Sequence, residues 1–297
     1  MQGHPAWNPL DRGREDRQTP GFRLEADRVV GEFPLVKPRT LKDRLASGEL
    51  CPVFALSRIV HPVVVEMFGR AGGYRGFWLD QEHASNTTEQ IAVLALAARA
   101  NDMDMIVRLP PTGYWQVTQC LEAGAGGVMA AQIHSVDQAR EFVSWTRFTP
   151  AGTRGLNNNG CDADYTHVPH ARFIAEANQR VLAGIQIETT GALEQVEPIA
   201  ALPGVDLLFV GPSDLSMSLG IVGQFHHAVL WEAIERIANA CRSAGTAWGC
   251  VAPDAAFAER AIELGCRMPT LGNEILALRR GVDSLRSTFE KAFLASV

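Results

Sequence analysis

Two apolar runs of strand character end in carboxylates, Glu188 after Gly-Ile-Gln-Ile (184–187) and Asp214 after Leu-Leu-Phe-Val-Gly-Pro-Ser (207–213). The carboxyl ends of parallel strands meet at one edge of a sheet or one rim of a barrel, so both side chains are predicted to share a pocket. Paired carboxylates suit hard cations such as Mg²⁺ or Mn²⁺, which prefer oxygen ligands and keep water. The pair predicts a metal site and a substrate that chelates the metal.

An alternative exists for Asp214, because an aspartate after Gly-Pro-Ser can simply cap the next helix. Glu188 has no comparable structural role at the end of its strand. Gln186 stands two residues before Glu188, so both side chains are expected on the same face of the strand. In a barrel that face can be the interior, at the rim where ligands bind.

Further polar residues follow two earlier strand-like runs, with Asp80-Gln81-Glu82-His83 after one and Arg108 at the end of the other. Histidine titrates near neutral pH and often acts as a general base. Asp80 is expected to hydrogen-bond one ring nitrogen of His83 and leave the other to accept a proton. For Arg108, two roles stay open: a structural counter-ion, or a stabiliser of developing oxyanion charge.

The composition favours small-molecule chemistry. The chain has 297 residues, 46% hydrophobic and 20% charged, which is enough for one large core. A net charge of −6 without basic runs predicts no binding to nucleic acid or an anionic membrane. The six cysteines show no Cys-x-x-Cys pair, and no apolar run reaches the length of a membrane span. We therefore expect reduced thiols and a cytoplasmic location.

From residue 39 onward, short apolar runs alternate with amphipathic ones, which predicts a single (β/α)₈ barrel over 39–297. Asn86 with Glu89 predicts the start of a helix over 87–100. Pro269 is unusual, because it falls inside the last predicted strand and removes a hydrogen-bond donor. Residues 1–38 are polar and rich in proline and are predicted to form a partly irregular extension. The predicted strands are 52–57, 76–80, 104–108, 126–130, 182–188, 206–210, 246–251 and 266–271.

Five collinear motifs resemble the metal-dependent class II pyruvate aldolases. That family contains the 4-hydroxy-2-oxoheptanedioate and 2-keto-3-deoxy sugar acid aldolases and lies within the phosphoenolpyruvate/pyruvate barrel superfamily. The resemblance runs from about Leu41 to the last helix. The motifs are Trp-Leu-Asp-Gln-Glu-His-Ala-Ser-Asn (78–86), Val-Arg-Leu-Pro (107–110), Thr-Pro-Ala-Gly-Thr-Arg-Gly (149–155), Gln-Ile-Glu-Thr (186–189) and Gly-Pro-Ser-Asp-Leu-Ser (211–216).

The resemblance implies a role for each matching residue. Glu188 and Asp214 would bind a divalent metal, Mg²⁺, Mn²⁺ or Co²⁺. Arg108 would hold the keto oxygen and stabilise the enolate, and His83 oriented by Asp80 would be the acid/base. The resemblance also implies a homo-oligomer, such as a hexamer. The implied substrate-binding residues are Arg108, Gln186, Gly211, Pro212 and Ser213.

Two departures from the family pattern bear on specificity. Gln81 stands where the family commonly has glycine, and its side chain is expected to narrow the pocket or reach the substrate. After Gly155 the segment contains three asparagines, 157–159, and long loops without a period often cover a binding site. We expect this loop to contact the aldehyde and to favour neutral, hydroxylated aldehydes over anionic ones.

The sequence therefore predicts a divalent-metal-dependent aldolase that converts a 4-hydroxy-2-oxo acid to pyruvate and an aldehyde, or the reverse, through a metal-stabilised enolate. No lysine Schiff base is required. Two alternatives remain: another 2-oxo-acid lyase or mutase of the same superfamily, and a non-catalytic protein that binds a metal and an oxoacid. Simple binding would not need the base, which argues against the second.

Overall fold

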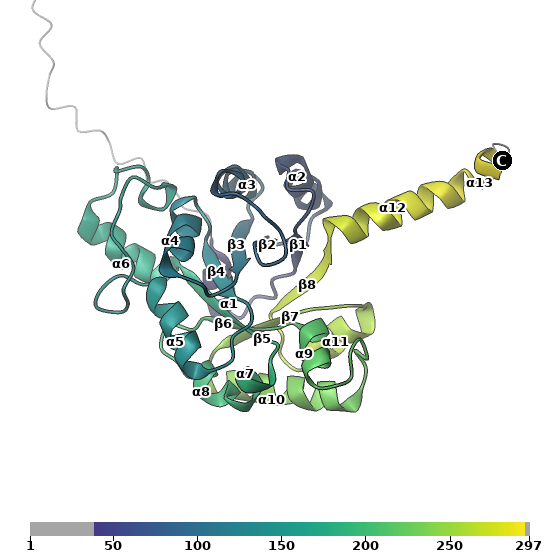
Figure 1. The fold of residues 1–297 in the computed structure, drawn as a ribbon. Coiled ribbons are helices and arrows are strands. Elements are labelled where there is room, and N and C mark those ends of the chain that lie inside the picture. Colours follow the sequence, from purple (N-terminus) through teal and green to yellow (C-terminus); the bar gives the residue numbers. More distant parts are fainter. Residues whose placement is uncertain (1–38, 295–297) are drawn as a thin grey trace, which may run out of the picture. The chain divides into compact units, whose positions relative to one another are not determined.

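Eight parallel strands close into a barrel in chain order (Figure 1). The structure is a computed structural model that describes residues 39–294, so the predicted extension at 1–38 lies outside the described residues. The strands are β1 (Val53–Leu56), β2 (Gly76–Asp80), β3 (Asp104–Leu109), β4 (Gly127–Ala130), β5 (Leu182–Ile187), β6 (Leu207–Val210), β7 (Ala247–Val251) and β8 (Met268–Asn273).

All eight predicted strands form, and β8 differs most from its predicted bounds. It begins at Met268, so that Pro269 is its second residue, paired with Cys250 of β7. The pairing of β8 with β1 then shifts register, and Gly272 adopts a φ of 96°. Proline is tolerated near a strand start and next to such irregularities, because few ladder hydrogen bonds are lost there.

Helices alternate with the strands, which confirms the predicted (β/α)₈ barrel. The helices are α1 (Leu41–Ala46), α2 (Pro62–Ala71), α3 (Thr88–Ala100), α4 (Tyr114–Glu122), α5 (Val136–Trp145), α6 (His170–Arg180), α7 (Thr190–Glu194), α8 (Val196–Ala200), α9 (Pro212–Ser218), α10 (Ala228–Ala244), α11 (Ala255–Glu263), α12 (Glu274–Thr288) and α13 (Glu290–Leu294), with a 3₁₀ turn, η1, at Cys161–Ala163.

The predicted cap of α3 is wrong by one residue. Thr87 caps the helix, and Thr87 and Gln90 form the reciprocal capping box in place of Asn86 and Glu89. The Asn86 side chain is used elsewhere, because its amide donates to the carbonyl of Asp80 at 2.6 Å. Asn86 thereby closes the turn that follows β2.

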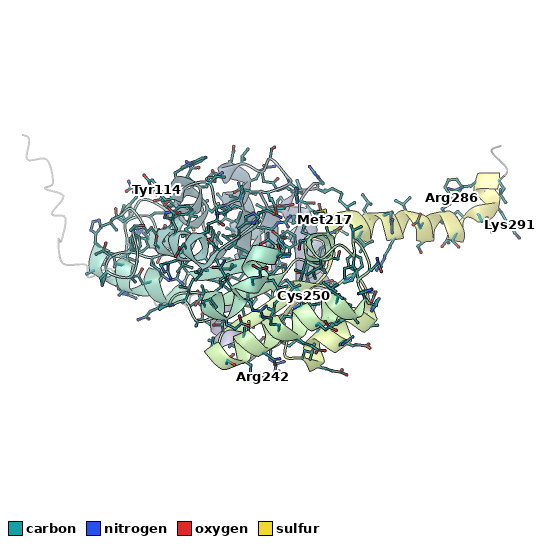
Figure 2. All side chains as sticks on the ribbon, turned by 60° about the horizontal axis from the view of Figure 1, so that its bottom comes forward. Tyr114, Met217, Arg242, Cys250, Arg286 and Lys291 are labelled. Atoms are coloured by element: carbon teal, nitrogen blue, oxygen red, sulfur yellow. The ribbon has the colours of Figure 1, made fainter. Side chains whose placement is uncertain are left out.

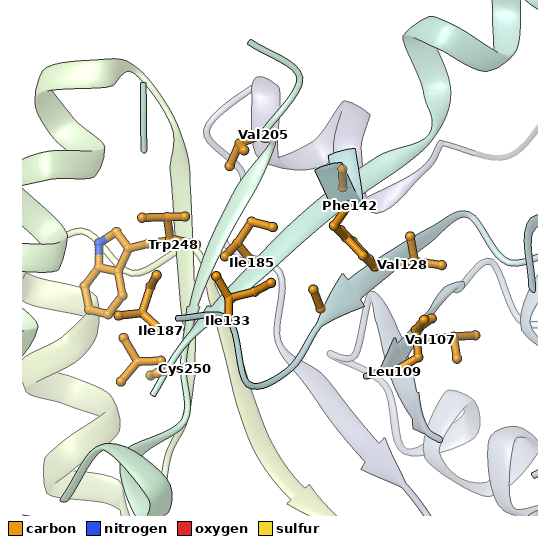
Figure 3. Packing of buried hydrophobic residues seen from close by; sticks show 14 of the residues in the cluster. Val107, Leu109, Val128, Ile133, Phe142, Ile185, Ile187, Val205, Trp248 and Cys250 are labelled. Atoms are coloured by element: carbon orange, nitrogen blue, oxygen red, sulfur yellow. The ribbon is translucent and has the colours of Figure 1, made fainter. Parts of the chain in front are cut away.

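The core has two layers, because alternate residues of each strand point to opposite faces. Outward residues such as Val107, Leu109 and Ile185 pack under the helices in the larger cluster (Figure 3). Inward residues such as Trp78 and Phe209 fill the barrel in a second cluster. The last inward positions lie at the carboxyl-end rim, where charged side chains replace apolar ones.

The helix that follows β8 behaves differently from the others. α12 and α13 project away from the barrel (Figure 1), and Figure 2 shows Arg286 and Lys291 far out on this arm. In α12 only Glu274 is buried, and its Oε1 lies within 2.6 to 3.3 Å of the backbone N–H groups of residues 57–59.

Within residues 39–294, no helix combines the length and the apolar character needed to cross a membrane.

Candidate active site

Asp80 and Arg108 meet at the rim, where β2 and β3 end side by side. Arg108 Nε lies 3.2 Å from Asp80 Oδ1 and Nη2 lies 2.9 Å from Oδ2, so the pair is bidentate. The guanidinium also lies over the Trp78 ring, 4.7 Å from its centroid. Bidentate pairing and ring stacking together fix the orientation of the buried Arg108.

A second carboxylate contacts Arg108 from the turn after β2. Glu82 Oε2 lies 3.2 Å from Arg108 Nη1, on the side of the guanidinium away from Asp80. Sequence reasoning missed Glu82, although it stands in the same polar run as Asp80 and His83. Arg108 is therefore held by two carboxylates.

The prediction that Asp80 orients the His83 ring is wrong. Asp80 Oδ1 accepts the backbone N–H groups of Glu82 and His83, at 3.0 and 3.3 Å, and both of its oxygens pair with Arg108. An aspartate commonly bonds the backbone of the turn that follows it, which leaves no reach toward a side chain three residues on. The His83 ring is 61% exposed, and its Nε2 lies 3.7 Å from Glu82 Oε2.

The expectation for Gln81 is also corrected. Its side-chain amide donates to the carbonyl of Asn86 at 2.6 Å, and its oxygen lies 3.4 Å from Cys120 Sγ. Both contacts are with the scaffold behind the turn, so Gln81 braces the loop and does not narrow the pocket. The loop after β2 thus carries its own internal support.

Glu188 follows β5 and is almost fully buried, with 1% exposure. Its Oε1 accepts from Gln132, both from the backbone N–H at 2.7 Å and from the side-chain amide at 3.1 Å. The amide of Gln186 donates to Oε2, so Gln186 and Glu188 share a face as predicted. Gln132 was missed because it lies beyond the predicted strand, in a left-handed conformation with φ 52° that no pattern announces.

Burial raises the pKa of Glu188 to about 7. The backbone N–H of Gln132 opposes this shift, whereas the nearby charges of Glu82 and Asp214 add to it. Asp214 lies in the first turn of α9, whose N-cap is Gly211, and it makes no capping hydrogen bond. Helix capping, the alternative for Asp214, is therefore absent.

The donor set fits a divalent cation. Asp80 and Glu82 are already paired with the Arg108 guanidinium, and Glu188 lies close enough to Glu82, Asp214 and Arg108 for their charges to act on it. The oxygen of Gln186 is buried and has no hydrogen-bond partner among the described residues. Within 39–294 no three His, Cys, Asp or Glu side chains are grouped so that they could hold a metal, so an ion at Glu188 and Asp214 would complete its shell with other oxygens, such as those of water or substrate.

Glycine at 211 is required by this packing. A Cβ there would lie 2.6 Å from Glu188 Oε2 and 2.5 Å from the Gln186 amide nitrogen. Pro212 is buried, Ser213 is exposed, and Ser218 Oγ donates to the carbonyl of Glu188 at 3.2 Å. The segment after β6 thus lies directly against Glu188.

The pKa of Glu188 predicts a pH-dependent stability. A carboxyl whose folded pKa is raised favours the neutral form, so the penalty for ionisation grows as pH rises from about 4.5 to about 7 and stays constant above. At pH 8 without metal, we expect Glu188→Gln to be more stable than wild type and to melt at a higher temperature. The gain in the free energy of unfolding should be at most roughly 3 kcal/mol. The gain should vanish near pH 4.5.

Calorimetry at both pH values provides the measurement, with the exposed Glu263→Gln as the matched control. Gln186 can flip its amide to accept from the new amide at 188, so the substitution keeps its hydrogen bonds. An equal effect of Glu188→Gln at pH 8 and pH 4.5 would contradict the assigned cause.

The loop with three asparagines does not reach this rim within one chain. Asn157 donates to Glu122 at 2.9 Å, at the end of α4, and the loop joins α5 to α6 and β5. Connections from a helix to the next strand lie at the amino ends of the strands, opposite the ligand-binding rim. Within one chain, contrary to the prediction, the loop is therefore not placed to contact an aldehyde at this rim.

The motif at 149–155 has a structural role in the same connection. Its Arg154 is buried and paired with Asp162, and the guanidinium lies 4.7 Å from the Phe148 ring centroid and 5.9 Å from that of Phe173. These contacts close the long segment between α5 and α6.

Comparison with known proteins identifies the family. Residues 71–280 match the family model described as HpcH/HpaI aldolase/citrate lyase. A hydroxypyruvate/pyruvate aldolase of Paraburkholderia phytofirmans is 34% identical over 83% of this chain and 97% of its own. A 5-keto-4-deoxy-D-glucarate aldolase of Klebsiella pneumoniae is 29% identical over 86% of this chain and 98% of its own.

A solved structure agrees with these matches. The HpcH/HpaI aldolase of Desulfitobacterium hafniense superposes with a TM-score of 0.78 and 31% identity, covering 84% of this chain and 97% of the other. The barrel, the collinear motifs and these matches lead to one assignment. The chain belongs to the HpcH/HpaI aldolase/citrate lyase family and is a lyase of the aldolase type.

Proposed function

We propose that the protein is a divalent-metal-dependent aldolase that cleaves a 4-hydroxy-2-oxo acid to pyruvate and an aldehyde, or forms it from them. The observation that carries this proposal is the buried carboxylate of Glu188, which lies with Asp214 near an Arg108 that two other carboxylates hold in place. The relatives named as aldolases of hydroxypyruvate, pyruvate and 5-keto-4-deoxy-D-glucarate support the 2-oxo acid as the common fragment.

Glu188 and Asp214 would hold the metal, and Mg²⁺, Mn²⁺ and Co²⁺ all accept such oxygen ligands. When bound, the ion supplies Lewis-acid polarisation of the keto group. Gln186 and the 211–213 segment shape the pocket beside Glu188. A cytoplasmic location fits the six cysteines, all of which are free.

Arg108 presents a fixed cation where negative charge develops on the substrate oxygen, and this preorganisation lowers the barrier to forming the enolate. His83 lies exposed at the rim and accepts the proton of the 4-hydroxyl group. The C3–C4 bond then breaks, its electron pair becomes the enolate, and the aldehyde leaves. A proton delivered to C3 completes pyruvate.

Exchange of the pyruvate methyl protons in heavy water tests the proposal. With Mg²⁺ or Mn²⁺ present, the protein should exchange deuterium into the methyl group, which NMR follows directly. Exchange only with a different 2-oxo acid would favour another lyase or mutase. Calorimetric binding of pyruvate without exchange would favour a non-catalytic binding protein.

The proposal includes a homo-oligomer in which α12 docks on a second copy of the chain. Apolar side chains recur every three or four residues along one side of α12, which is the pattern of a helix face that packs against protein. The helices of a (β/α)₈ barrel normally form a ring around it, yet α12 contacts its own barrel only near its start. The stripe consists of Ile275, Leu278, Val282, Leu285 and Phe289, each 42 to 58% exposed.

A second copy of the chain is the partner that fits α12, because the barrel wall of that copy lacks the helix that would normally cover it. Val63 and Met67 on α2 are 51% and 67% exposed, and Leu271 on β8 is 38% exposed. An α12 from a partner copy would bury apolar surface on the helix and on the barrel it covers. If each chain places its α12 on the other, the exposed apolar surface of both chains is covered.

Replacing Leu278 and Leu285 together by glutamate should therefore reduce the assembly size. Light scattering after size exclusion measures the mass, and Arg286→Glu on the same helix is the control for added negative charge. The wild type should be an oligomer, the control should match it, and the double variant should run smaller. A monomeric wild type, or an unchanged double variant, would contradict this mode of assembly.

A further inference from the structure

Glu82 contacts two functional side chains of the rim, Arg108 and His83. Its side chain is 11% exposed, and its Oε2 lies 3.2 Å from Arg108 Nη1 and 3.7 Å from His83 Nε2. The same oxygen is buried and makes no hydrogen bond of good geometry among the described residues. One carboxylate oxygen therefore lies between the guanidinium and the imidazole with acceptor capacity to spare.

Asp80 cannot serve both groups. Its two oxygens pair with Nε and Nη2 of Arg108, and Oδ1 also accepts two backbone N–H groups of the turn. Arg108 Nη1 is left for Glu82, and Glu82 is the only acid with a contact to the His83 ring among the described residues. Because the exposed ring has no other polar contact there, Glu82 alone can restrain it.

We propose that Glu82 is a positioning residue of the aldolase site: it fixes the second side of Arg108 and orients the His83 ring. This proposal rests on the function proposed above. An Nε2–H directed at the Glu82 carboxylate leaves the lone pair on Nδ1, which becomes the proton acceptor. The 3.7 Å separation is longer than a hydrogen bond, so this role requires the exposed ring to turn toward Glu82. Glu82 thus links the group that stabilises the enolate to the group that moves the proton.

Two reactions of one site separate these two effects. Aldol cleavage needs Arg108 for the enolate and His83 to remove the hydroxyl proton. Decarboxylation of oxaloacetate gives the same enolate when its C3–C4 bond breaks and CO₂ leaves with no hydroxyl proton to remove, and solvent then protonates C3. Decarboxylation therefore reports on Arg108, and the difference between the reactions reports on His83.

The experiment compares Glu82→Gln, Glu82→Asp, His83→Ala and the Glu82→Gln/His83→Ala double variant in both reactions with Mg²⁺. Glu89→Gln, an exposed glutamate at the start of α3, is the matched control. Residues that position functional groups typically cost about 10–100-fold when changed. We expect Glu82→Gln to lower the kcat of decarboxylation about tenfold and that of aldol cleavage roughly a hundredfold. Glu82→Asp, which keeps the charge, should recover part of both losses.

The double variant supplies the decisive comparison. In the His83→Ala background, Glu82→Gln should cost aldol cleavage no more than it costs decarboxylation, because the restrained ring is gone. Three results would each overturn the inference. The first is that Glu82→Gln, with His83 present, lowers both reactions equally. The others are wild-type activity of Glu82→Gln, and lower activity of Glu82→Asp than of Glu82→Gln. If circular dichroism shows that Glu82→Gln does not fold, Glu82→Asp takes its place. It is then compared in both reactions with and without His83→Ala.

Failure of the inference and failure of the proposed function give different results. A wild-type protein that neither cleaves 4-hydroxy-2-oxo acids nor exchanges pyruvate protons contradicts the function. A wild-type protein active in both assays, with Glu82 variants that behave like the Glu89 control, contradicts only the role of Glu82.

Discussion

Removal of divalent metal is expected to abolish cleavage of 4-hydroxy-2-oxo acids, and Mg²⁺ or Mn²⁺ should restore it. Of the four carboxylates at 80, 82, 188 and 214, the buried Glu188 and the half-buried Asp214 are the two that make no ion pair with Arg108 in the described part of the chain. Two protein ligands bind a hard cation with modest affinity, so a chelator should strip it fully. Without the ion, neither enolate formation nor aldol cleavage has its Lewis acid.

The measurement is pyruvate release after treatment with EDTA, followed by titration with each metal. Asp214→Asn should raise the metal concentration needed for half-maximal activity, because one charged ligand is lost. The exposed Glu263→Gln should leave that concentration unchanged. Full turnover by protein shown to be metal-free would remove the ion from the proposed mechanism.

The barrel was predictable because its signals are local. Short apolar runs alternate with amphipathic ones, and each run became a strand with bounds within two residues of the prediction. The two-residue spacing of Gln186 and Glu188 placed both on one strand face, where the structure has them bonded. The adjacent strand ends of Asp80 and Arg108 likewise brought a charged pair together.

Contacts that depend on turn geometry were not predictable. Asp80 bonds the backbone of its own turn in place of the His83 ring, because backbone donors lie closer than the side chain. Gln132 reaches Glu188 only through a left-handed conformation, which its sequence neighbours do not signal.

The side of the barrel on which a loop lies follows from connectivity, and this holds for the asparagine loop at 157–159. The segment follows α5 and precedes β5, so it had to lie at the amino ends of the strands. For the projecting α12, by contrast, connectivity does not predict where the helix packs. Its apolar stripe is visible in the sequence, but whether such a face packs within the chain or on a partner depends on the tertiary structure.

Replacement of Arg108 by alanine is expected to impair both binding and turnover. Its cation attracts the anionic 2-oxo acid in the ground state and stabilises the enolate more strongly, so KM should rise and kcat should fall about 10²–10³-fold. The change also leaves Asp80 and Glu82 buried without a counter-ion, which destabilises the fold. Arg108→Lys, which keeps one charge but lacks the bidentate fork, should fall between alanine and wild type.

The comparison with His83→Ala separates the two roles. His83 is exposed and touches no group that holds the metal or the oxoacid, so its loss should lower kcat of aldol cleavage by about 10²–10⁴-fold and leave KM unchanged. Steady-state kinetics of both variants, with thermal melts to confirm folding, measure the difference. If Arg108→Ala lowered kcat without raising KM, the arginine would act on the enolate alone and other groups would bind the oxoacid. If both constants stayed at their wild-type values in a folded variant, Arg108 would be only a structural counter-ion to Asp80 and Glu82. Equal activity of His83→Ala and wild type at every pH would assign the proton transfer to another base, and Glu82, whose carboxylate lies 3.7 Å from the ring, would be the first candidate.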